Sequence, residues 1–207
     1  GKTIGQGLEE MDKIASETLD DTFRTALSGD SKDYRESSSS LMFAFILALV
    51  LIYLILAAQF ESFKDPFIIM LTVPLAIAGA LIFMFAGGIT MNIFSQIGII
   101  MLIGLVAKNG ILIVEFANLK QESGEDKMAA IRNAALQRLR PILMTSVSTI
   151  LGLIPLAFAT GEGANQRIAM GTAVVGGMLV STLLTMYIVP AIYTYISTNR
   201  KVKTETV

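Results

Sequence analysis

Lys108 is a lone charged residue deep inside an apolar stretch of the chain. The 42 residues that precede it, from Pro66 to Ala107, contain no Asp, Glu, Lys or Arg. Placing an ammonium group in hydrocarbon costs roughly 2.5–3.5 kcal/mol on insertion scales, so such a residue usually faces a partner or a water-filled path. A carboxylate or a moving ion would be that partner, and the pattern predicts part of an ion-coupled membrane transporter. The alternative is a structural lysine bound to backbone carbonyls of a neighbouring helix.

Two other polar residues close to Lys108 are candidates for the same chemistry. Asn109 follows it directly, and Glu115 lies seven residues further on. Seven residues are nearly two helical turns, so Glu115 is expected on the face of Lys108, about 10 Å away along the helix axis. That separation is too great for a direct ion pair. Glu115 is near the end of its apolar stretch, and it is open whether it is an interfacial carboxylate or a member of a proton relay.

A second set of candidates recurs every seven residues in a later stretch. Arg138, Thr145 and Gly152 place a cation, a hydroxyl and a small residue on one helix face. Arg140 fits best as a positively charged anchor at the membrane surface. Spacing leaves open whether Arg138 is another anchor, and whether Thr145 binds its own helix or turns toward Lys108.

The composition agrees with a membrane protein and excludes several other classes. Hydrophobic residues make up 53% of the chain and charged residues 16%, with a mean hydropathy of +0.64. A net charge of −1 argues against a nucleic-acid partner. The chain has no Cys and no His, so a proton must be carried by a carboxylate or a lysine. We find no pattern of catalytic residues and no metal-ligand cluster.

Five stretches are long enough to span about 30 Å of hydrocarbon as helices of roughly 20 residues. Their expected limits are 39–58, 66–86, 93–116, 141–160 and 168–196. The sequence therefore predicts an all-α membrane bundle over residues 31–198, followed by a cytoplasmic tail over 199–207.

The first 30 residues have a different character. Helical spacing of apolar residues from Leu8 to about Thr18 predicts a helix, and residues 22–27 could form a strand. We expect this segment to be a short α/β remnant that completes a larger soluble domain upstream.

Positive charges predict the orientation of the spans. Loops after the first and third spans and the tail hold 1 + 5 + 3 = 9 Lys and Arg, whereas the other side has only Arg167. The nine mark the cytoplasmic side, which places Gly88 and Gly163 outside, together with the N-terminal segment.

Several motifs resemble the resistance–nodulation–division (RND) exporters, in the hydrophobe/amphiphile efflux branch. The closest matches are Leu56-Ala-Ala-Gln-Phe-Glu61, Gly104-Leu-Val-Ala-Lys108-Asn109-Gly-Ile-Leu-Ile-Val-Glu115, Arg138-Leu-Arg-Pro-Ile-Leu-Met-Thr145-Ser and Gly171-Thr-Ala-Val-Val-Gly-Gly-Met178. The resemblance covers residues from about 31 to 195.

The resemblance implies that the five spans are helices 8–12 of a twelve-helix transporter, and that residues 1–30 end a periplasmic porter domain. It assigns Lys108, Arg138 and Thr145 to proton coupling with an aspartate pair on a helix outside this chain. It also implies a homotrimer in the bacterial inner membrane, with a periplasmic membrane-fusion adaptor and an outer-membrane channel. The proton motive force would drive export of drugs without a cofactor, and the substrate pocket would lie in the porter domain.

Two alternatives stay open at this point. One is an RND relative that exports metal ions or lipids, which residues of the porter domain would reveal. The other is a membrane scaffold that transports nothing, in which Lys108 has only a structural role.

Overall fold

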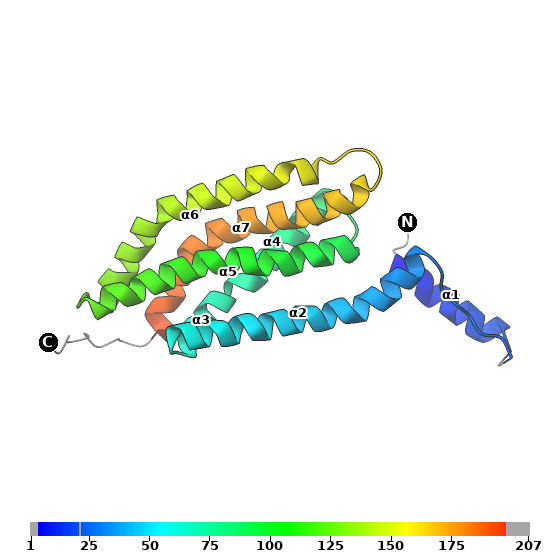
Figure 1. The fold of residues 1–207 in the computed structure, drawn as a ribbon, viewed down its shortest axis with the longest axis horizontal. Coiled ribbons are helices and arrows are strands. Elements are labelled where there is room, and N and C mark those ends of the chain that lie inside the picture. The colour runs from blue at the N-terminus through cyan, green and yellow to red at the C-terminus, as the bar shows by residue number, and fades with distance from the viewer. Residues whose placement is uncertain (1–3, 21, 198–207) are drawn as a thin grey trace. The chain divides into compact units, whose positions relative to one another are not determined.

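The computed structural model of the protein describes residues 4–20 and 22–197, and these residues form helices without a strand. The seven helices are α1 (Ile4–Thr18), α2 (Asp30–Phe60), α3 (Lys64–Met70), α4 (Thr72–Ala86), α5 (Ile93–Glu122), α6 (Lys127–Ala157) and α7 (Ala164–Ile196) (Figure 1). The chain divides into two compact units, residues 1–45 and 46–207. The expected tail at 199–207 lies outside the described residues.

The first unit holds α1 and the start of α2. The helix expected up to Thr18 is confirmed, because α1 ends at that residue. The strand expected at residues 22–27 is not confirmed, since this segment has no regular structure. A strand needs a neighbouring strand to pair with its backbone groups, and the described residues of this unit provide none.

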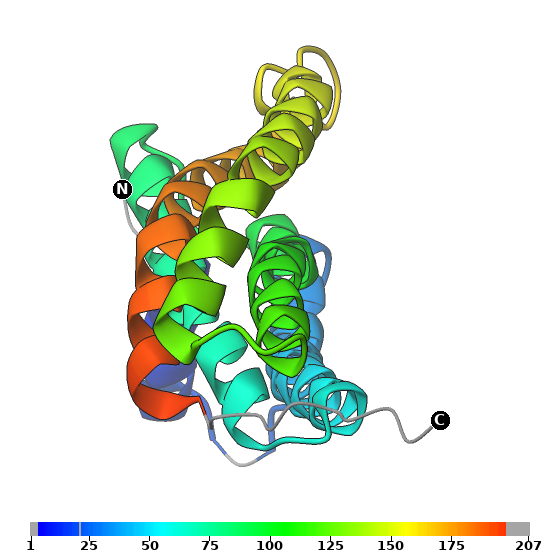
Figure 2. The same ribbon diagram turned by 90° about the vertical axis from the view of Figure 1, so that its left-hand side faces the viewer.

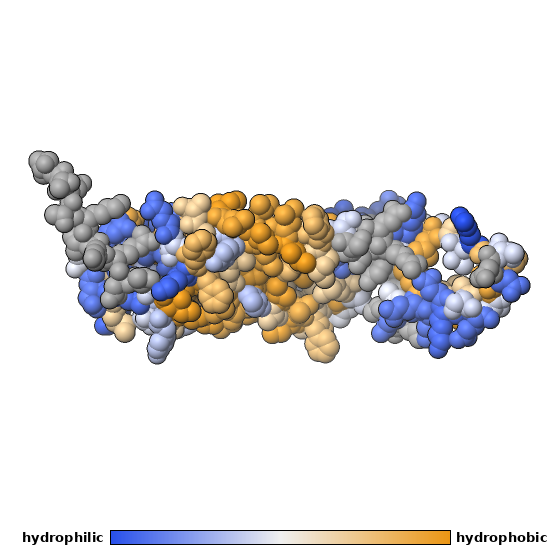
Figure 3. Space-filling view, turned by 90° about the horizontal axis from the view of Figure 1, so that it is seen from below, coloured by the Kyte–Doolittle hydropathy of each residue, from blue (hydrophilic) through white to orange (hydrophobic). Residues whose placement is uncertain are grey.

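Five helical segments are long and apolar enough to cross a membrane, as the sequence predicted. They are Ser40–Phe60, Lys64–Ala86, Ile93–Glu122, Lys127–Ala157 and Ala164–Ile196. The face shown in Figure 3 is mostly hydrophobic along the middle of the bundle, with hydrophilic residues at the end near the α2–α3 turn. The second unit is therefore a membrane bundle.

The second span is not one continuous helix but two, α3 and α4, separated at Leu71. Pro74 explains the break, because it has no N–H to donate to the carbonyl of Met70 and its ring crowds that carbonyl. The hydroxyl of Thr72 donates a hydrogen bond of 2.7 Å to the carbonyl of Ile69 at the break. This bond compensates part of the lost helical bonding.

The fourth span differs most from its expected limits. Residues 141–160 were expected, but α6 begins at Lys127 and holds Pro141 in its interior. Asp126 starts the helix, since its side chain accepts a hydrogen bond from the backbone N–H of Met128. The missing N–H of Pro141 accounts for the bend of α6 along its length (Figure 1).

The third span starts where the sequence predicted and ends later. Asn92 and Ser95 exchange side-chain and backbone hydrogen bonds of 2.9 Å in a capping box, which fixes the start of α5 at Ile93. The helix continues to Glu122, six residues beyond the expected limit. Gly124 then turns the chain with a φ of 96°, which favours glycine.

Helix α7 is the common neighbour of the bundle and packs against α3, α4, α5 and α6 (Figure 2). Small residues make this close packing possible. A Cβ on Gly171 would lie 2.6 Å from the backbone nitrogen of Ala157, and one on Gly177 would lie 2.9 Å from the carbonyl oxygen of Ala76. The glycines of α7 are therefore contact points with α6 and α4.

A buried polar cluster joins α3, α5 and α7 near the α5–α6 turn. The carboxylate of Asp65, which is 2% exposed, accepts hydrogen bonds from Asn118 (3.0 Å) and from the hydroxyl of Ser197 (3.2 Å). Tyr193 donates to Asn118 and accepts from Gln121. Because each bond crosses between elements, the cluster fixes the relative positions of three helix ends.

Candidate functional site

Lys108 lies on the open face of α5. The residues on this face are exposed in the described bundle and recur at spacings of three, four or seven positions. They are Ile97, Met101, Gly104, Lys108, Glu115 and Leu119. Lys108 and Glu115 are the charged residues of this stripe, and the other members are apolar or glycine. A charge surrounded by apolar residues in the middle of a span has a high cost unless it has a partner.

Asn109, the next residue, is buried instead of exposed. It is 2% exposed, because a step of one residue turns a helical side chain by about 100°. Its amide group points into the packed interior between α5, α6 and α7, away from the face of Lys108. The two neighbours in the sequence therefore do not share one site.

Two adjacent residues of α6 differ in the same way: Thr145 is exposed, whereas Ser146 is buried. The hydroxyl of Thr145 donates to the carbonyl of Ile142 at 3.1 Å, which is a bond within its own helix. Thr149 in turn donates to the carbonyl of Thr145 at 2.8 Å. The conformation described here is thus the one in which Thr145 binds its own helix.

Three buried polar side chains meet at the level of these residues and form what we call the buried triad: Asn109, Ser146 and Thr182. The amide of Asn109 donates to the hydroxyls of Ser146 (3.3 Å) and Thr182 (3.4 Å), and Thr182 donates to Ser146 at 3.2 Å. Each residue comes from a different helix, so the triad connects α5, α6 and α7. Interhelical hydrogen bonds of this kind contribute about 0.6 to 2 kcal/mol each in a membrane.

Helix geometry then places Lys108 and Thr145 on one side of the α5–α6 pair. The two helices run antiparallel, and Asn109 and Ser146 face each other across their contact. Going back one residue rotates each side chain by about 100° in opposite senses, because the helix directions are opposite. Both Lys108 and Thr145 therefore point to the same side of the pair, and Thr182 of α7 covers the other side. Among the described residues, neither makes a side-chain hydrogen bond or ion pair with the other.

Arg138 connects α6 to α5 through an aromatic ring. Its guanidinium carbon lies 4.3 Å from the centroid of the Phe116 ring, and the Nζ atom of Lys120 lies 5.9 Å from the same centroid. Such cation–π contacts contribute about 0.5 to 2 kcal/mol. The Nε atom of Arg138 is buried and has no hydrogen-bond partner in the part of the chain that the structure describes. Arg138 thus retains a donor for a further acceptor.

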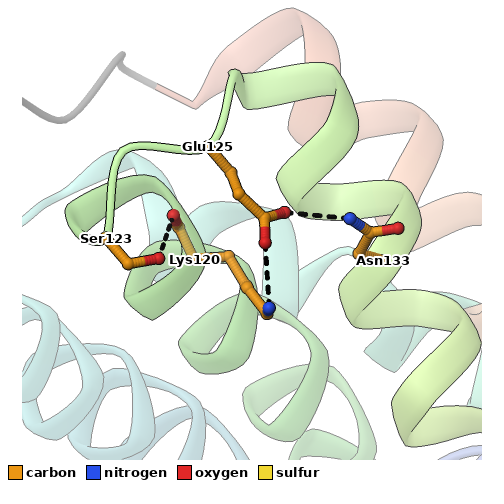
Figure 4. Close-up of polar contacts among 4 residues, drawn as sticks. All are labelled: Lys120, Ser123, Glu125 and Asn133. Carbon is orange, nitrogen blue, oxygen red and sulfur yellow. Dashed lines mark hydrogen bonds and ion pairs between the residues drawn. The ribbon is translucent and has the colours of Figure 1, made fainter.

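The short turn between α5 and α6 fixes the pairing of the two helices that carry the candidate residues. Figure 4 shows Glu125 between two donors, Lys120 of α5 and Asn133 of α6, each at 2.9 Å. Ser123 also donates to the carbonyl of Lys120 at 2.8 Å. The bonds from Lys120 and then Asn133 hold the pKa of Glu125 below the usual value of a glutamate.

Two members of the buried triad, Ser146 and Thr182, could hardly be found from the sequence. Ser146 follows Thr145 directly, but nothing in its spacing showed that it faces inward. Thr182 lies 73 residues from Asn109, and its only signal was a Ser-Thr pair within an apolar span. The polar cluster around Asp65 also depends on contacts between distant residues.

Together, these features define a multi-pass membrane protein whose apolar helices present a lysine, a carboxylate and a hydroxyl on an open side. The chain belongs to the AcrB/AcrD/AcrF family, whose model matches residues 1–197. The recognition of an RND transporter from its motifs is thereby confirmed.

Relatives with 38–40% identity are similar to almost the whole chain. An uncharacterized transporter of Haemophilus influenzae is 38% identical over 97% of the chain. The toluene efflux pump membrane transporter TtgB of Pseudomonas putida is 39% identical over 95%, and the multidrug resistance protein MdtF of Escherichia coli is 40% identical over 93%. The chain spans about a fifth of the length of these curated relatives, between 19% and 20%.

Proposed function

We propose that the chain is the energy-coupling membrane part of a proton-driven exporter of hydrophobic and amphiphilic compounds, such as drugs and solvents. The observation that carries this proposal is Lys108, a charge in the middle of a span on the open face of α5, whose other members are apolar or glycine except for Glu115. Family membership supports it, as do relatives named for toluene efflux and multidrug resistance. The exporter would lie in the bacterial inner membrane, and its substrate pocket would be elsewhere in the whole protein.

The proposed coupling rests on the electrostatics of Lys108. As the resemblance implies, its partner would be a pair of aspartates on a helix outside this chain. A nearby ammonium group stabilises ionised carboxylates, and protonation of a carboxylate removes that attraction. Lys108 would then have different contacts in the two protonation states. Such a difference can shift an equilibrium between two helix arrangements, which is what coupling of proton flow to export requires.

Thr145, Arg138 and Glu115 would assist this step from neighbouring positions. Thr145 lies on the side of the α5–α6 pair to which Lys108 points, and its hydroxyl can exchange the bond to Ile142 for one to a carboxylate. The buried Nε of Arg138 would donate to a further acceptor near the α5–α6 turn. Glu115 shares the stripe of Lys108 and remains either a relay member or an interfacial carboxylate.

The whole transporter is proposed to be a homotrimer that works with a periplasmic adaptor and an outer-membrane channel. No cofactor is needed in this scheme, because the proton motive force supplies the free energy. The support is the family to which the chain belongs. Cross-linking of the purified whole protein, followed by mass determination, would test the trimer.

Replacing Lys108 tests the coupling role directly. In the whole transporter, Lys108→Met should abolish proton-coupled efflux without loss of membrane-inserted protein, because removing a costly charge does not destabilise the bundle. Lys108→Arg should restore only part of the rate, since a planar guanidinium differs from a compact ammonium group. Efflux and proton flux would be measured in proteoliposomes with an imposed pH gradient.

Lys64→Met is the matched control, because it removes a lysine at the end of a span and should leave efflux unchanged. Full activity of Lys108→Met would reject the coupling role and favour a structural lysine in a scaffold.

A further inference from the structure

We infer that the buried triad is a positioning device for the coupling residues, in which Ser146 and Thr182 act through Asn109. This inference rests on the proposed function of Lys108 and adds two residues that do not touch the proton path. The triad would set the rotation of α5 and α6 about their own axes. That rotation decides where Lys108 and Thr145 point.

The first support is the position of the triad. Lys108 and Thr145 are each one residue before a triad member, on helices that run in opposite directions. A rotation of either helix that moved Asn109 away from Ser146 would also turn Lys108 or Thr145 out of the common side. The three hydrogen bonds, of 3.2 to 3.4 Å, therefore fix the rotations of both helices together.

The second support is the surrounding packing, because the described part of the chain has no other side-chain hydrogen bond between α5, α6 and α7 at this level. The buried Ser181 next to Thr182 donates within its own helix, to Met178. The side chains next to the triad on α5 and α7 that are buried are mostly aliphatic or small, such as Val106, Ala107, Gly110 and Met178. Apolar contacts are not directional, whereas an amide between two hydroxyls has a defined orientation. The polar triad therefore provides the specificity that the apolar packing does not.

Thr185 provides an internal comparison on the same helix. It is 1% exposed, lies three residues after Thr182, and its hydroxyl has no hydrogen-bond partner among the described residues. Thr182 and Thr185 thus have the same chemistry and nearly the same burial, but only Thr182 belongs to the triad. Replacing each with valine separates loss of the triad bonds from loss of any buried hydroxyl.

The experiment measures export by the whole transporter in proteoliposomes, expressed per molecule of inserted protein. Thr182→Val and Ser146→Ala should each lower the maximal rate about threefold or more, with little change in the KM for the exported compound. Thr182→Ser keeps the hydroxyl and should restore the rate. Thr185→Val should behave as the wild type. A purely steric role for Thr182 would instead be matched by valine, which is close to threonine in shape, and would be disturbed by serine.

Two results would overturn the inference. One is equal maximal rates for Thr182→Val, Ser146→Ala and Thr185→Val, and the other is failure of Thr182→Ser to restore what Thr182→Val loses. If one variant does not accumulate in the membrane, the other tests the same triad. Lys108→Met separates the two proposals, because full activity of that variant rejects the proposed function, whatever the triad variants do. An inactive Lys108→Met with fully active triad variants rejects only the positioning role.

Discussion

The environment of a polar side chain in this bundle changes completely from one residue to the next. Lys108 and Thr145 are exposed on apolar helices, whereas Asn109 and Ser146 beside them are buried and bonded to each other. The hydroxyl of Thr145 donates within its own helix, to Ile142, whereas the amide of Asn109 donates across to Ser146 and Thr182. Adjacent residues therefore have separate environments, one on the open side of the helix pair and one in the packing between helices.

Thr145→Val is expected to slow proton-coupled export, and Thr145→Ser should retain most of it. Valine keeps the shape of the side chain but removes the hydroxyl, which in the proposed mechanism exchanges Ile142 for a carboxylate. Export would be measured in the whole transporter at neutral and at mildly acidic external pH. Thr149→Val is the control, because Thr149 lies one turn away and also donates to its own helix. Wild-type export by Thr145→Val at both pH values would show that the hydroxyl is only structural.

Glu125 is expected to titrate at a lower pH than an ordinary glutamate. Its pKa is lowered mainly by the hydrogen bond from Lys120 and next by that from Asn133. Because the folded pKa is depressed, the stabilisation is present above the unfolded pKa and is lost as the pH falls through the folded pKa. Lys120→Met should raise the pKa of Glu125 more than Asn133→Ala, as measured by carboxyl NMR of the solubilised protein. No change in either variant would contradict the assigned cause.

At the scale of helices, the bundle depends on small residues where α7 crosses α4, α5 and α6. A Cβ on Gly171 would lie 2.6 Å from the nitrogen of Ala157 and 2.7 Å from the carbonyl carbon of Leu156. These are backbone atoms of α6, which cannot rotate away as a side chain can. A Cβ on Gly110 would meet the Cγ2 atom of Ile69 at 3.2 Å, which a small side-chain movement relieves.

Gly171→Ala should therefore destabilise the protein clearly more than Gly110→Ala. Overpacking of a well-packed interior typically costs about 1 to 3 kcal/mol, and a clash with backbone belongs at the upper end. Thermal unfolding of the detergent-purified protein, compared for the two variants, measures the difference. Equal stability of both variants would mean that α6 and α7 can separate at this point without cost.

The sequence predicted helices well and interruptions less well. The start of α5 at Ile93 was predicted correctly, and the capping box of Asn92 and Ser95 accounts for it, because a cap acts locally. The start of α6 at Lys127 was missed, since Arg132, Arg138 and Arg140 make that part of the helix too polar to count as a span. The break at Leu71 depends on how Pro74 is accommodated, and a single helix was expected there.

The candidate site was predictable only in part, for a similar reason. Lys108 and Thr145 stand out because their polarity conflicts with an apolar span. The inward direction of Asn109 depends on Thr182, 73 residues away, and no local pattern encodes such a contact. Charge, caps and hydropathy are local properties, whereas the partner of a side chain is a tertiary property.

At the scale of the molecule, the turns between spans alternate between two ends of the bundle. The α5–α6 turn is at the end that carries most of the Lys and Arg residues, and the α6–α7 turn is at the other end. The bias of nine to one predicts a cytoplasmic position for the α5–α6 turn.

Cysteine labelling tests this orientation, and the chain itself has no cysteine. Ser123→Cys should react with a membrane-impermeant maleimide only after the cytoplasmic side is made accessible. Glu162→Cys, in the opposite turn, should react from outside in intact spheroplasts. Both residues are exposed in turns, so neither substitution disturbs packing. Labelling of the cysteine at position 162 only from the cytoplasmic side would reverse the proposed topology.

The central position of α7 also bears on the order in which the bundle can assemble during synthesis. Translation produces α3, α4, α5 and α6 before the helix against which all four pack. Until α7 enters the membrane, the surfaces facing Gly171, Gly176 and Gly177 lack their close neighbour. During that interval the earlier helices have only their contacts with one another, such as those of α5 with α6 and with α4, and the arrival of α7 completes the packing of the bundle.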